Sequence, residues 1–313
     1  MLYEMTYDDS LAVDKFPADT ASMRVGTVAY HAERELDTLM YQDSGMYRNQ
    51  QYGTANSLVL QTMYEEIAIL WDQELKFRPN FSTENNMVVI PTIFAKVCGV
   101  KDGNIEDYWL SIKKLLVTDT LFIDRLPCIK QGVPNPWKNV SSLLIRNGKL
   151  RRDEIKKHKL YKYGVLREEA QEHILNKLQL LLDKRFIKGT FENGTENVII
   201  ATVLNMDKTM VRLIQKFDFT KTNPKVVCLS LNESEMSLED TIIFTFLNLI
   251  GFDIVFFVPT GYQTIERYMN KEAALIEEHQ IGEYMYDLTV PNFNKLKDKA
   301  PQKTSWFAKL FGK

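Results

Sequence analysis

Short apolar runs alternate with stretches of helical period through the second half of the chain, and this alternation constrains the fold more than any other feature. The apolar runs, which we predict as strands, are residues 198–204, 226–231, 254–258 and 285–290. The stretches with helical period, which we predict as helices, are residues 208–217, 238–250 and 262–269. Strands without polar alternation are typical of a parallel sheet that is buried on both faces. This order of elements predicts a doubly wound sheet.

The first half of the chain shows the same alternation with fewer elements. Strands are predicted at 57–61 and 87–91, and helices at 64–71 and 107–116. Strands that alternate with helices indicate layered βαβ units. The predicted fold class is therefore α/β, with two layered Rossmann-like α/β halves, the second of which has a mainly parallel sheet.

Changes in composition along the chain predict five segments. They are a polar leader (1–24), an N-terminal α/β half (25–126), a Pro-rich and charged connector (127–163), a C-terminal Rossmann-like α/β half (164–294) and a basic amphipathic tail (295–313). The connector is predicted to be a solvated linker, because prolines and a block of lysines and arginines interrupt its apolar pattern. The second half opens with a predicted amphipathic helix over 166–186.

The charge balance and the cysteine content exclude several classes of protein. The 313 residues include 39 Lys and Arg against 41 Asp and Glu, a net charge of −2, so we expect no nucleic-acid partner. Three widely spaced cysteines indicate free thiols in a reducing compartment. The first residues lack the features of a signal peptide, and no apolar stretch has the roughly 20 residues of a membrane span. A cytoplasmic location is therefore expected.

The sharpest candidate site follows the predicted strand 254–258, where the sequence continues as PTGYQTIE. Ligands of open α/β sheets lie at the carboxyl ends of strands, where helix N-termini attract anions. Gly261 would let a phosphate approach the backbone, Thr260 would donate its hydroxyl, and Tyr262 would stack on a base or sugar, with Gln263 beside them. The alternative is a tight turn in which Thr260 only caps the next helix.

A second group of candidate residues lies in the first half of the chain. A glycine-containing loop carries Tyr47 and Arg48, and arginine binds phosphates and carboxylates through two hydrogen bonds. Arg78 and Lys96 are predicted to join this group as further cations. The alternative is an ordinary loop with a surface arginine.

Two other polar positions have a simpler structural interpretation. Asp207 follows an apolar run, as the nucleophile of haloacid-dehalogenase-type phosphotransferases does, but no glycine-rich flap follows, and capping of the next helix is favoured. Phe217 and Phe219 are expected to anchor a loop to the core, in preference to a polar site made by Asp218 and Lys221. The four histidines show no metal-ligand spacing.

The end of the chain is basic and carries several aromatic residues. Within residues 300–313, the large apolar side chains share one helical face. Such a segment makes weak peripheral contact with an anionic membrane or docks on a partner protein. The alternatives are that the aromatic residues pack back on the domain or that the segment is disordered.

Several of these segments together resemble the YceG family, whose members belong to bacterial tellurite-resistance (Ter) stress operons. The resemblance is carried by YQDSGMYR (41–48), TMYEEI (62–67), VIPTIFAK (89–96), LIQKFDFT (213–220), FLNLIGFD (246–253) and, most strongly, FVPTGYQTIE (257–266). It implies a cytoplasmic protein that acts in toxic-ion or envelope stress beside other products of the same operon. It assigns no catalytic residue. Because family members are typically longer, the chain is expected to be a C-terminal portion.

Two functional hypotheses remain open at this point. In the first, the chain binds or processes a nucleotide-like or sugar-phosphate metabolite between its two halves, and a nucleotide with Mg²⁺ or Mn²⁺ is one compatible cofactor. In the second, the chain is a non-catalytic adaptor that assembles stress-response proteins near the membrane through its tail. No complete acid–base or metal constellation decides between them.

Overall fold

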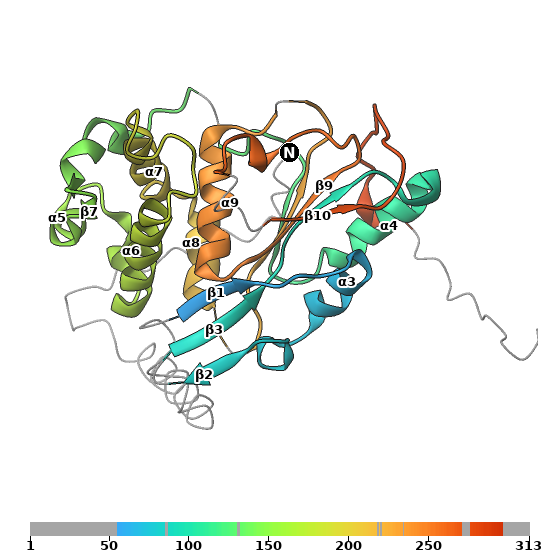
Figure 1. The fold of residues 1–313 in the computed structure, drawn as a ribbon, viewed down its shortest axis with the longest axis horizontal. Helices are drawn as coiled ribbons and strands as arrows, with labels where there is room; N and C mark the ends of the chain where they lie inside the picture. The colour runs from blue at the N-terminus through green and yellow to red at the C-terminus, as the bar shows by residue number, and fades with distance from the viewer. Residues whose placement is uncertain are drawn as a thin grey trace, which may run out of the picture.

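The computed structural model describes residues 55–84, 87–129, 132–217, 219, 221–233, 235–270 and 276–296. The predicted leader 1–24 and the tail segment 300–313 lie outside these residues. Figure 1 shows a twisted sheet with helices on both faces, which confirms the predicted α/β class.

The main sheet has five strands in the order β10-β4-β9-β8-β5, and every neighbouring pair is parallel. The strands are β4 (Phe94–Cys98), β5 (Thr120–Ile123), β8 (Lys225–Leu229), β9 (Asp253–Val258) and β10 (Glu277–Gln280). All residues of β4, β8 and β9 are buried. The apolar runs 226–231 and 254–258 predict β8 and β9, whereas β4 and β5 are not among the predicted strands. The sheet takes strands from both residue ranges that the sequence analysis divides into halves.

A smaller sheet continues the main one. Its strands are β1 (Ala55–Val59), β2 (Ser82–Glu84) and β3 (Met87–Thr92), in the order β1-β3-β2. Only Ile93 separates β3 from β4, so one stretch of chain runs through both sheets. A separate hairpin pairs β6 (Ile145–Arg146) with β7 (Lys149–Leu150).

Helices cover both faces of the main sheet. They are α3 (Tyr64–Asp72), α4 (Ile105–Leu115), α5 (Arg152–Lys157), α6 (Glu168–Asp183), α7 (Thr195–Val203), α8 (Lys208–Lys216) and α9 (Leu238–Ile250). Short 3₁₀ turns lie at Leu75–Phe77, Lys101–Gly103, Pro136–Asn139, Ser141–Leu144, Lys162–Val165, Ile265–Arg267 and Phe293–Lys295. In Figure 1, α3 and α4 lie on one side of the sheet and α9 on the other, with α6, α7 and α5 beyond it.

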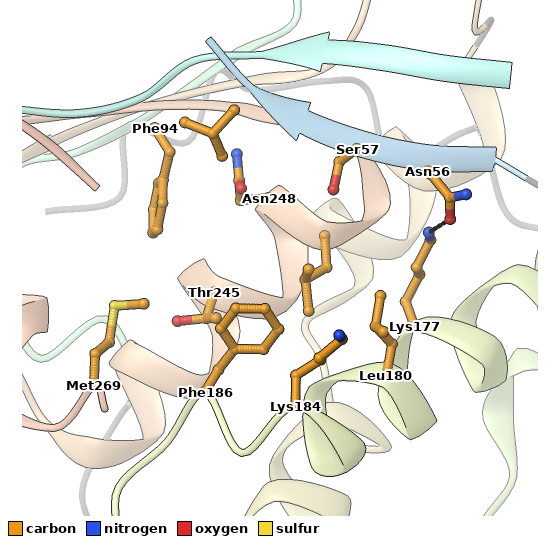
Figure 2. A pocket seen from close by; sticks show the side chains of 12 residues that line it. Asn56, Ser57, Phe94, Lys177, Leu180, Lys184, Phe186, Thr245, Asn248 and Met269 are labelled. Carbon is orange, nitrogen blue, oxygen red and sulfur yellow. Dashed lines mark hydrogen bonds between the residues drawn. The ribbon is translucent and has the colours of Figure 1, made fainter. Parts of the chain in front are cut away.

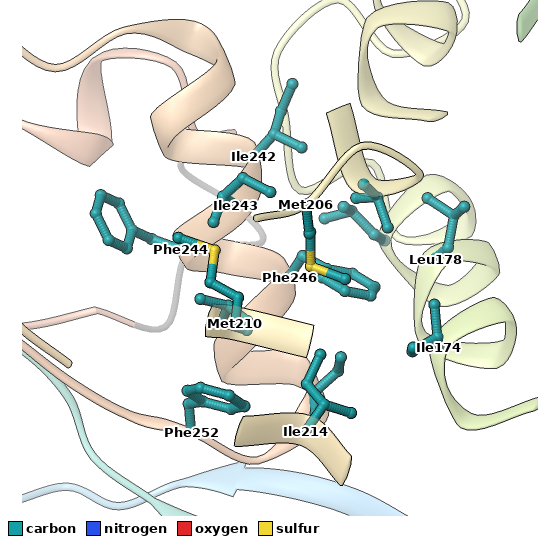
Figure 3. Close-up of a cluster of buried hydrophobic side chains, with 14 of the residues drawn as sticks. Ile174, Leu178, Met206, Met210, Ile214, Ile242, Ile243, Phe244, Phe246 and Phe252 are labelled. Atoms are coloured by element: carbon teal, nitrogen blue, oxygen red, sulfur yellow. The ribbon is translucent and has the colours of Figure 1, made fainter. Parts of the chain in front are cut away.

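Successive side chains of a strand point to opposite faces of the sheet, and the main sheet therefore has a separate apolar core on each face. On β4, Ala95 and Val97 face the core formed with α3 and α4, whereas Phe94 and Cys98 face the core formed with α9. Figure 3 shows the second core, in which side chains of α6, α8 and α9 interdigitate. Helix α9 forms as predicted, because a capping box at Ser237 opens it and a glycine closes it.

One predicted strand is a helix. Residues 198–204 fall in α7, which is packed against α6 and α9 and is buried on most of its surface. A helix that is apolar nearly all round gives the same continuous apolar run as a buried strand. The left-handed Gly194 and the side chain of Asn193, which accepts from the Thr195 amide at 3.3 Å, start the helix despite its β-branched residues.

Two further predictions after β9 are wrong. Residues 262–269 form only the 3₁₀ turn Ile265–Arg267, because Thr264 has non-helical backbone angles and Glu266 is held by an ion pair with the sheet. Residues 285–290 form no strand, and β10 is the last strand within the described residues. Because β10 is an edge strand with alternating partial exposure, its sequence is polar, and a search for apolar runs misses it.

The predicted connector 127–163 is folded and is not a solvated linker. It contains the β6–β7 hairpin and α5, and it packs beside α6 and α7. Its side chains Trp137, Ile155 and Tyr163 are almost completely buried. Widely spaced large apolar residues therefore anchor a segment whose overall composition is polar.

A buried ion pair lies at the break between β3 and β4. Both amino groups of the Arg78 guanidinium contact the Asp253 carboxylate, at 2.9 and 2.6 Å, and both side chains are fully buried. Arg78 also donates to the carbonyl oxygens of Leu70 and Pro91, at 2.7 and 3.0 Å. Asp253 accepts the amide of Ile93 at 2.9 Å. The pair thereby ties α3 and the β3–β4 break to the start of β9.

Replacing Asp253 with Asn should lower the free energy of unfolding by about 3–5 kcal/mol, because the Arg78 charge would stay buried without its counter-charge. Urea denaturation of Asp253→Asn, Arg78→Met and the double variant measures the effect. We expect the double variant to lose less than the sum of the single losses. The surface pair of Lys138 and Glu239 is the control, since Lys138→Met should cost at most about 1 kcal/mol. Additive losses would show that the two side chains act independently.

Candidate functional site

The structure brings one predicted site residue, Lys96, to the loop that follows β9. Lys96 lies on β4 with its side chain buried, and its Nζ is 2.5 Å from Oε1 of Glu266 and 3.6 Å from Oε2 of Glu278. Burial opposes the charge of Lys96, but the hydrogen bond to Glu266 and the carboxylate charge outweigh it and raise the pKa of Lys96. Burial likewise opposes the charge of Glu266, and Lys96 nevertheless holds the pKa of Glu266 below its usual range.

The ion pair changes what Lys96 can do. Its charge is already neutralised by Glu266, and Thr264 donates to the second oxygen of that carboxylate at 2.9 Å. Lys96 therefore ties the loop after β9 and the edge strand β10 to the centre of the sheet. An incoming phosphate would have to displace this partly buried carboxylate. Arg78, which the sequence predicts to lie in the same group of cations, is instead buried against Asp253.

The residues of the PTGYQ turn contact their own chain. Gly261 has φ of +70°, and a Cβ there would lie 2.3 Å from the ring of Tyr284. Thr260 is buried, and its Oγ1 accepts from the Tyr262 amide at 3.5 Å. The ring of Tyr262 lies near that of Tyr286, with centroids 5.9 Å apart, and Gln263 is exposed. Gly261 is thus required for its backbone angle and for the close approach of Tyr284.

The segment 281–285 covers the carboxyl ends of β4 and β9. Val100 donates to the Glu283 carbonyl at 2.8 Å, and Met285 donates to the Pro259 carbonyl at 2.9 Å. Because no helix starts at Tyr262, the helix N-terminus that supported the anion prediction is also missing. Anion binding by Thr260, Gly261, Tyr262 and Gln263 remains a prediction.

Two other predictions from the sequence are confirmed, and others fall on residues outside the described ranges. The Asp207 carboxylate accepts the Thr209 amide at 2.7 Å, which confirms it as the cap of α8. The buried rings of Phe217 and Phe219 pack edge to face with centroids 4.5 Å apart, which confirms their role as anchors. Tyr47, Arg48 and Asp218 lie outside the described residues.

A cavity of about 140 Å³ lies elsewhere, between β1, α6 and α9 (Figure 2). Its lining is Asn56, Ser57, Val59, Phe94, Lys177, Leu180, Lys184, Phe186, Thr245, Asn248, Leu249 and Met269. We call it the Lys177 cavity. Apolar side chains form most of its wall area, and two lysines, two amides and two hydroxyl side chains supply its polar groups, which is a common composition for small-ligand sites.

Lys177 is buried in this cavity without an acidic partner among the described residues. Its side chain projects from α6, it is 4% exposed, and its Nζ lies 3.3 Å from Oδ1 of Asn56 on β1. Burial disfavours the charged ammonium and lowers the pKa of Lys177 from 10.5 to about 8. Lys184, two turns after Lys177 and directly after the last residue of α6, is exposed at the rim of the cavity.

Lys177 is not among the site residues predicted from the sequence, although one feature of the sequence points to it. The apolar stripe of the helix predicted over 166–186 includes Ile174, Leu178 and Leu181, and Lys177 directly precedes Leu178 on the buried side. A lysine within a buried helix face is unusual unless it is paired or functional. The strand β1 that completes the cavity is more than 100 residues away, so no local pattern in the sequence indicates a cavity.

The described residues contain neither a cluster of metal ligands nor a membrane-spanning helix. No group of three or more His, Cys, Asp and Glu side chains among them is arranged to hold a metal ion. None of the helices in this part of the chain combines the length and apolar character needed to cross a bilayer.

The comparisons with known proteins identify the family. The sequence model of the YceG domain matches residues 61–305, well over half of the chain. The chain belongs to the YceG family. It is similar to the uncharacterized protein YceG of Bacillus subtilis (strain 168), with 27% identity over 275 residues, which cover 84% of this chain and 50% of that protein. The chain thus spans about half the length of the curated relative. No solved structure matches it.

Replacing Lys177 with Met should stabilise this YceG chain by about 1–3 kcal/mol at pH 7, because it removes a buried charge. Since the folded-state pKa of about 8 lies below the ordinary 10.5, the destabilisation by Lys177 is full below pH 8. It declines between the two pKa values and vanishes above them. The stabilisation produced by Lys177→Met should therefore decrease between pH 8 and pH 10.5.

Urea denaturation from pH 7 to pH 10.5 measures this difference. Lys157→Met, at an exposed position on α5, is the control and should change stability by at most about 0.5 kcal/mol at every pH. A loss of stability in Lys177→Met at pH 7 would contradict the assigned environment.

Gly261→Ala should lower the free energy of unfolding by about 2–4 kcal/mol, because the new Cβ meets the Tyr284 ring at a left-handed backbone position. Thermal or urea denaturation measures the loss. Gly132→Ala is the matched control, since Gly132 has φ of +82° but open space around it. It should cost only about 1 kcal/mol. In a Tyr284→Ala background, Gly261→Ala should lose only the stability that the backbone angle costs, because the clash with the ring is gone. An unchanged loss of unfolding free energy in that background would rule out the Tyr284 contact as its cause.

Proposed function

We propose that this YceG chain binds a small phosphorylated metabolite in the Lys177 cavity as a component of a bacterial stress-response module. The observation that carries the proposal is a buried lysine that faces a cavity and has no carboxylate partner among the described residues. The stress-response role comes from the tellurite-resistance operons to which the resemblance points, and the other products of such an operon are the proposed partners.

The energetics of Lys177 favour an anionic ligand. Burying an ammonium without a counter-charge is unfavourable, and the lowered pKa of Lys177 reflects this destabilisation. A phosphate in the cavity would provide the missing charge, and its oxygens would accept hydrogen bonds from Lys177 and Lys184. Groups with such perturbed pKa values gather at functional sites.

The size of the cavity limits the ligand. Its volume of about 140 Å³ is below the roughly 300–1,000 Å³ typical of pockets for drug-sized molecules. This size favours a phosphorylated compound of a few carbons over an entire nucleotide. Apolar walls from Phe94, Phe186 and Leu249 would face the carbon skeleton, and the amide of Asn248 would face its hydroxyls.

Isothermal titration with inorganic phosphate and with glycerol 3-phosphate tests the proposal. We expect saturable binding of one molecule per chain, weakened at least about tenfold in Lys177→Met and less in Lys184→Met, since a buried charge contributes more than an exposed one. Lys157→Met should bind as the unmodified chain does.

Native mass spectrometry of the same variants gives the stoichiometry independently. Binding that Lys177→Met leaves unchanged, in protein that urea denaturation shows to be folded, would place the anion elsewhere. Absence of any saturable binding would contradict the proposal itself.

A further inference from the structure

We propose that Lys177 condenses with a small aldehyde or ketone that carries a phosphate, forming an imine within the Lys177 cavity. The inference rests on the proposed function, because it places the same class of ligand in the same cavity. It adds a covalent bond and a reactive carbonyl group to that ligand.

The surroundings of Lys177 favour its neutral amine over an ion pair. Its hydrogen-bond partner is the amide oxygen of Asn56, which is uncharged and holds an ammonium less strongly than a carboxylate does. Apolar residues of the same cavity lining include Leu180, three residues further along α6, and Val59 on β1. Lysines that form imines are activated by such desolvation.

The buried lysines Lys96 and Lys225 of this chain lack one or more of these features. Lys96 is paired with Glu266 at 2.5 Å. Lys225 donates to the Asn223 carbonyl at 3.0 Å and lies over the ring of Trp71, away from the residues that line the cavity. Lys177 combines burial, an uncharged partner and access to a cavity.

The lowered pKa of Lys177 supports the geometry. With a pKa of about 8, roughly a tenth of the Lys177 side chains are neutral at pH 7. An exposed lysine with a pKa near 10.4 is neutral in only about one molecule in 2,500 at that pH. A larger share of nucleophilic amine is therefore present at Lys177 than at the surface lysines.

Lys184 supplies a second contact for the ligand. It lies seven residues after Lys177, about 10 Å along the helix axis, and Figure 2 shows its amino group at the same cavity. The phosphate first binds between the two lysines, as proposed above; once the carbonyl carbon is bonded to Lys177 deeper in the cavity, the charge of Lys184 at the rim would hold the phosphate. A carbonyl compound without a phosphate would lack the contact with Lys184, so the cavity should bind it more weakly.

The reaction balances without an oxidant or a metal. The neutral Lys177 Nζ attacks the carbonyl carbon, a C–N bond forms, and the carbonyl oxygen becomes a hydroxyl. One nitrogen proton passes to that oxygen to complete the hydroxyl, and loss of the hydroxyl with the second nitrogen proton, relayed by solvent, releases one water molecule and leaves a C=N bond. The exposed rim at Lys184 gives solvent access for these proton transfers.

Trapping the imine tests the inference. The full chain is incubated with glyceraldehyde 3-phosphate and sodium cyanoborohydride, and peptide mass spectrometry locates the reduced adduct. We expect Lys177 to be modified at least about tenfold faster than Lys225 or the exposed Lys157, because its amine is both more neutral and closer to the bound phosphate. The rate should rise with pH and level off above about pH 8.

Two controls separate phosphate recognition from general amine reactivity. Propanal lacks the phosphate, so its reaction at Lys177 should be slower by at least about tenfold. Inorganic phosphate should compete with glyceraldehyde 3-phosphate. Lys177→Arg keeps a positive charge but has no amine that can form an imine, so it should bind phosphate and form no adduct.

The outcomes distinguish this inference from the proposed function. Saturable phosphate binding without an adduct at Lys177 would overturn the imine and leave the binding function in place. If neither saturable phosphate binding nor an adduct at Lys177 is found, both the binding function and the imine are overturned. Equal modification of Lys177, Lys157 and other surface lysines would show adventitious glycation and overturn the inference, whereas a selective and phosphate-competed adduct would establish it.

Discussion

The paired charges of Arg78 and Asp253 determine how the two sheets of this YceG chain are joined. A parallel strand that passes from one sheet to another must interrupt its hydrogen bonding, and the interruption at Ile93 leaves polar backbone groups inside the protein. Asp253 accepts the Ile93 amide, while Arg78 binds the carbonyl of Pro91. Asn248 of α9 completes the set, with its amide nitrogen 3.4 Å from the Ile93 carbonyl. The fold at this point is therefore specified by polar contacts within an apolar interior.

The Lys177 cavity lies beside this junction. Beyond the break, β4 pairs with β9 and β10, whereas β1 pairs with β3 in the smaller sheet and passes over α9. The side chains of α6 and α9 line the space under β1 on one side, and Phe94, the first residue of β4, lines it on the other. The interaction that stabilises the break thus also fixes the walls of the cavity, and Lys177 enters it from α6.

Strands that are buried on both faces can be predicted from the sequence, because continuous apolar runs such as 226–231 and 254–258 are typical of them. The run 198–204 is an exception, since a fully packed helix gives the same signal. The polar strand β10 carries no apolar signal at all. For the site, the sequence suggests Lys96 as a free cation, and its neutralisation depends on Glu266, which is 170 residues away. Lys177 lies within a helix whose apolar periodicity indicates a core and says nothing of a cavity.

The position of β4 in the sheet has a consequence for how the chain is made. Its two neighbours are β9 and β10, so the fully buried segment Phe94–Cys98 cannot pair in the sheet until residues beyond 250 have been synthesised. At a synthesis rate of about 5–20 residues per second, roughly 10–30 s separate the emergence of β4 from that of β9. During that interval an apolar strand is without its partners, as expected for a sheet dominated by long-range pairing. The nascent chain therefore exposes the edges of β4 until β9 is synthesised.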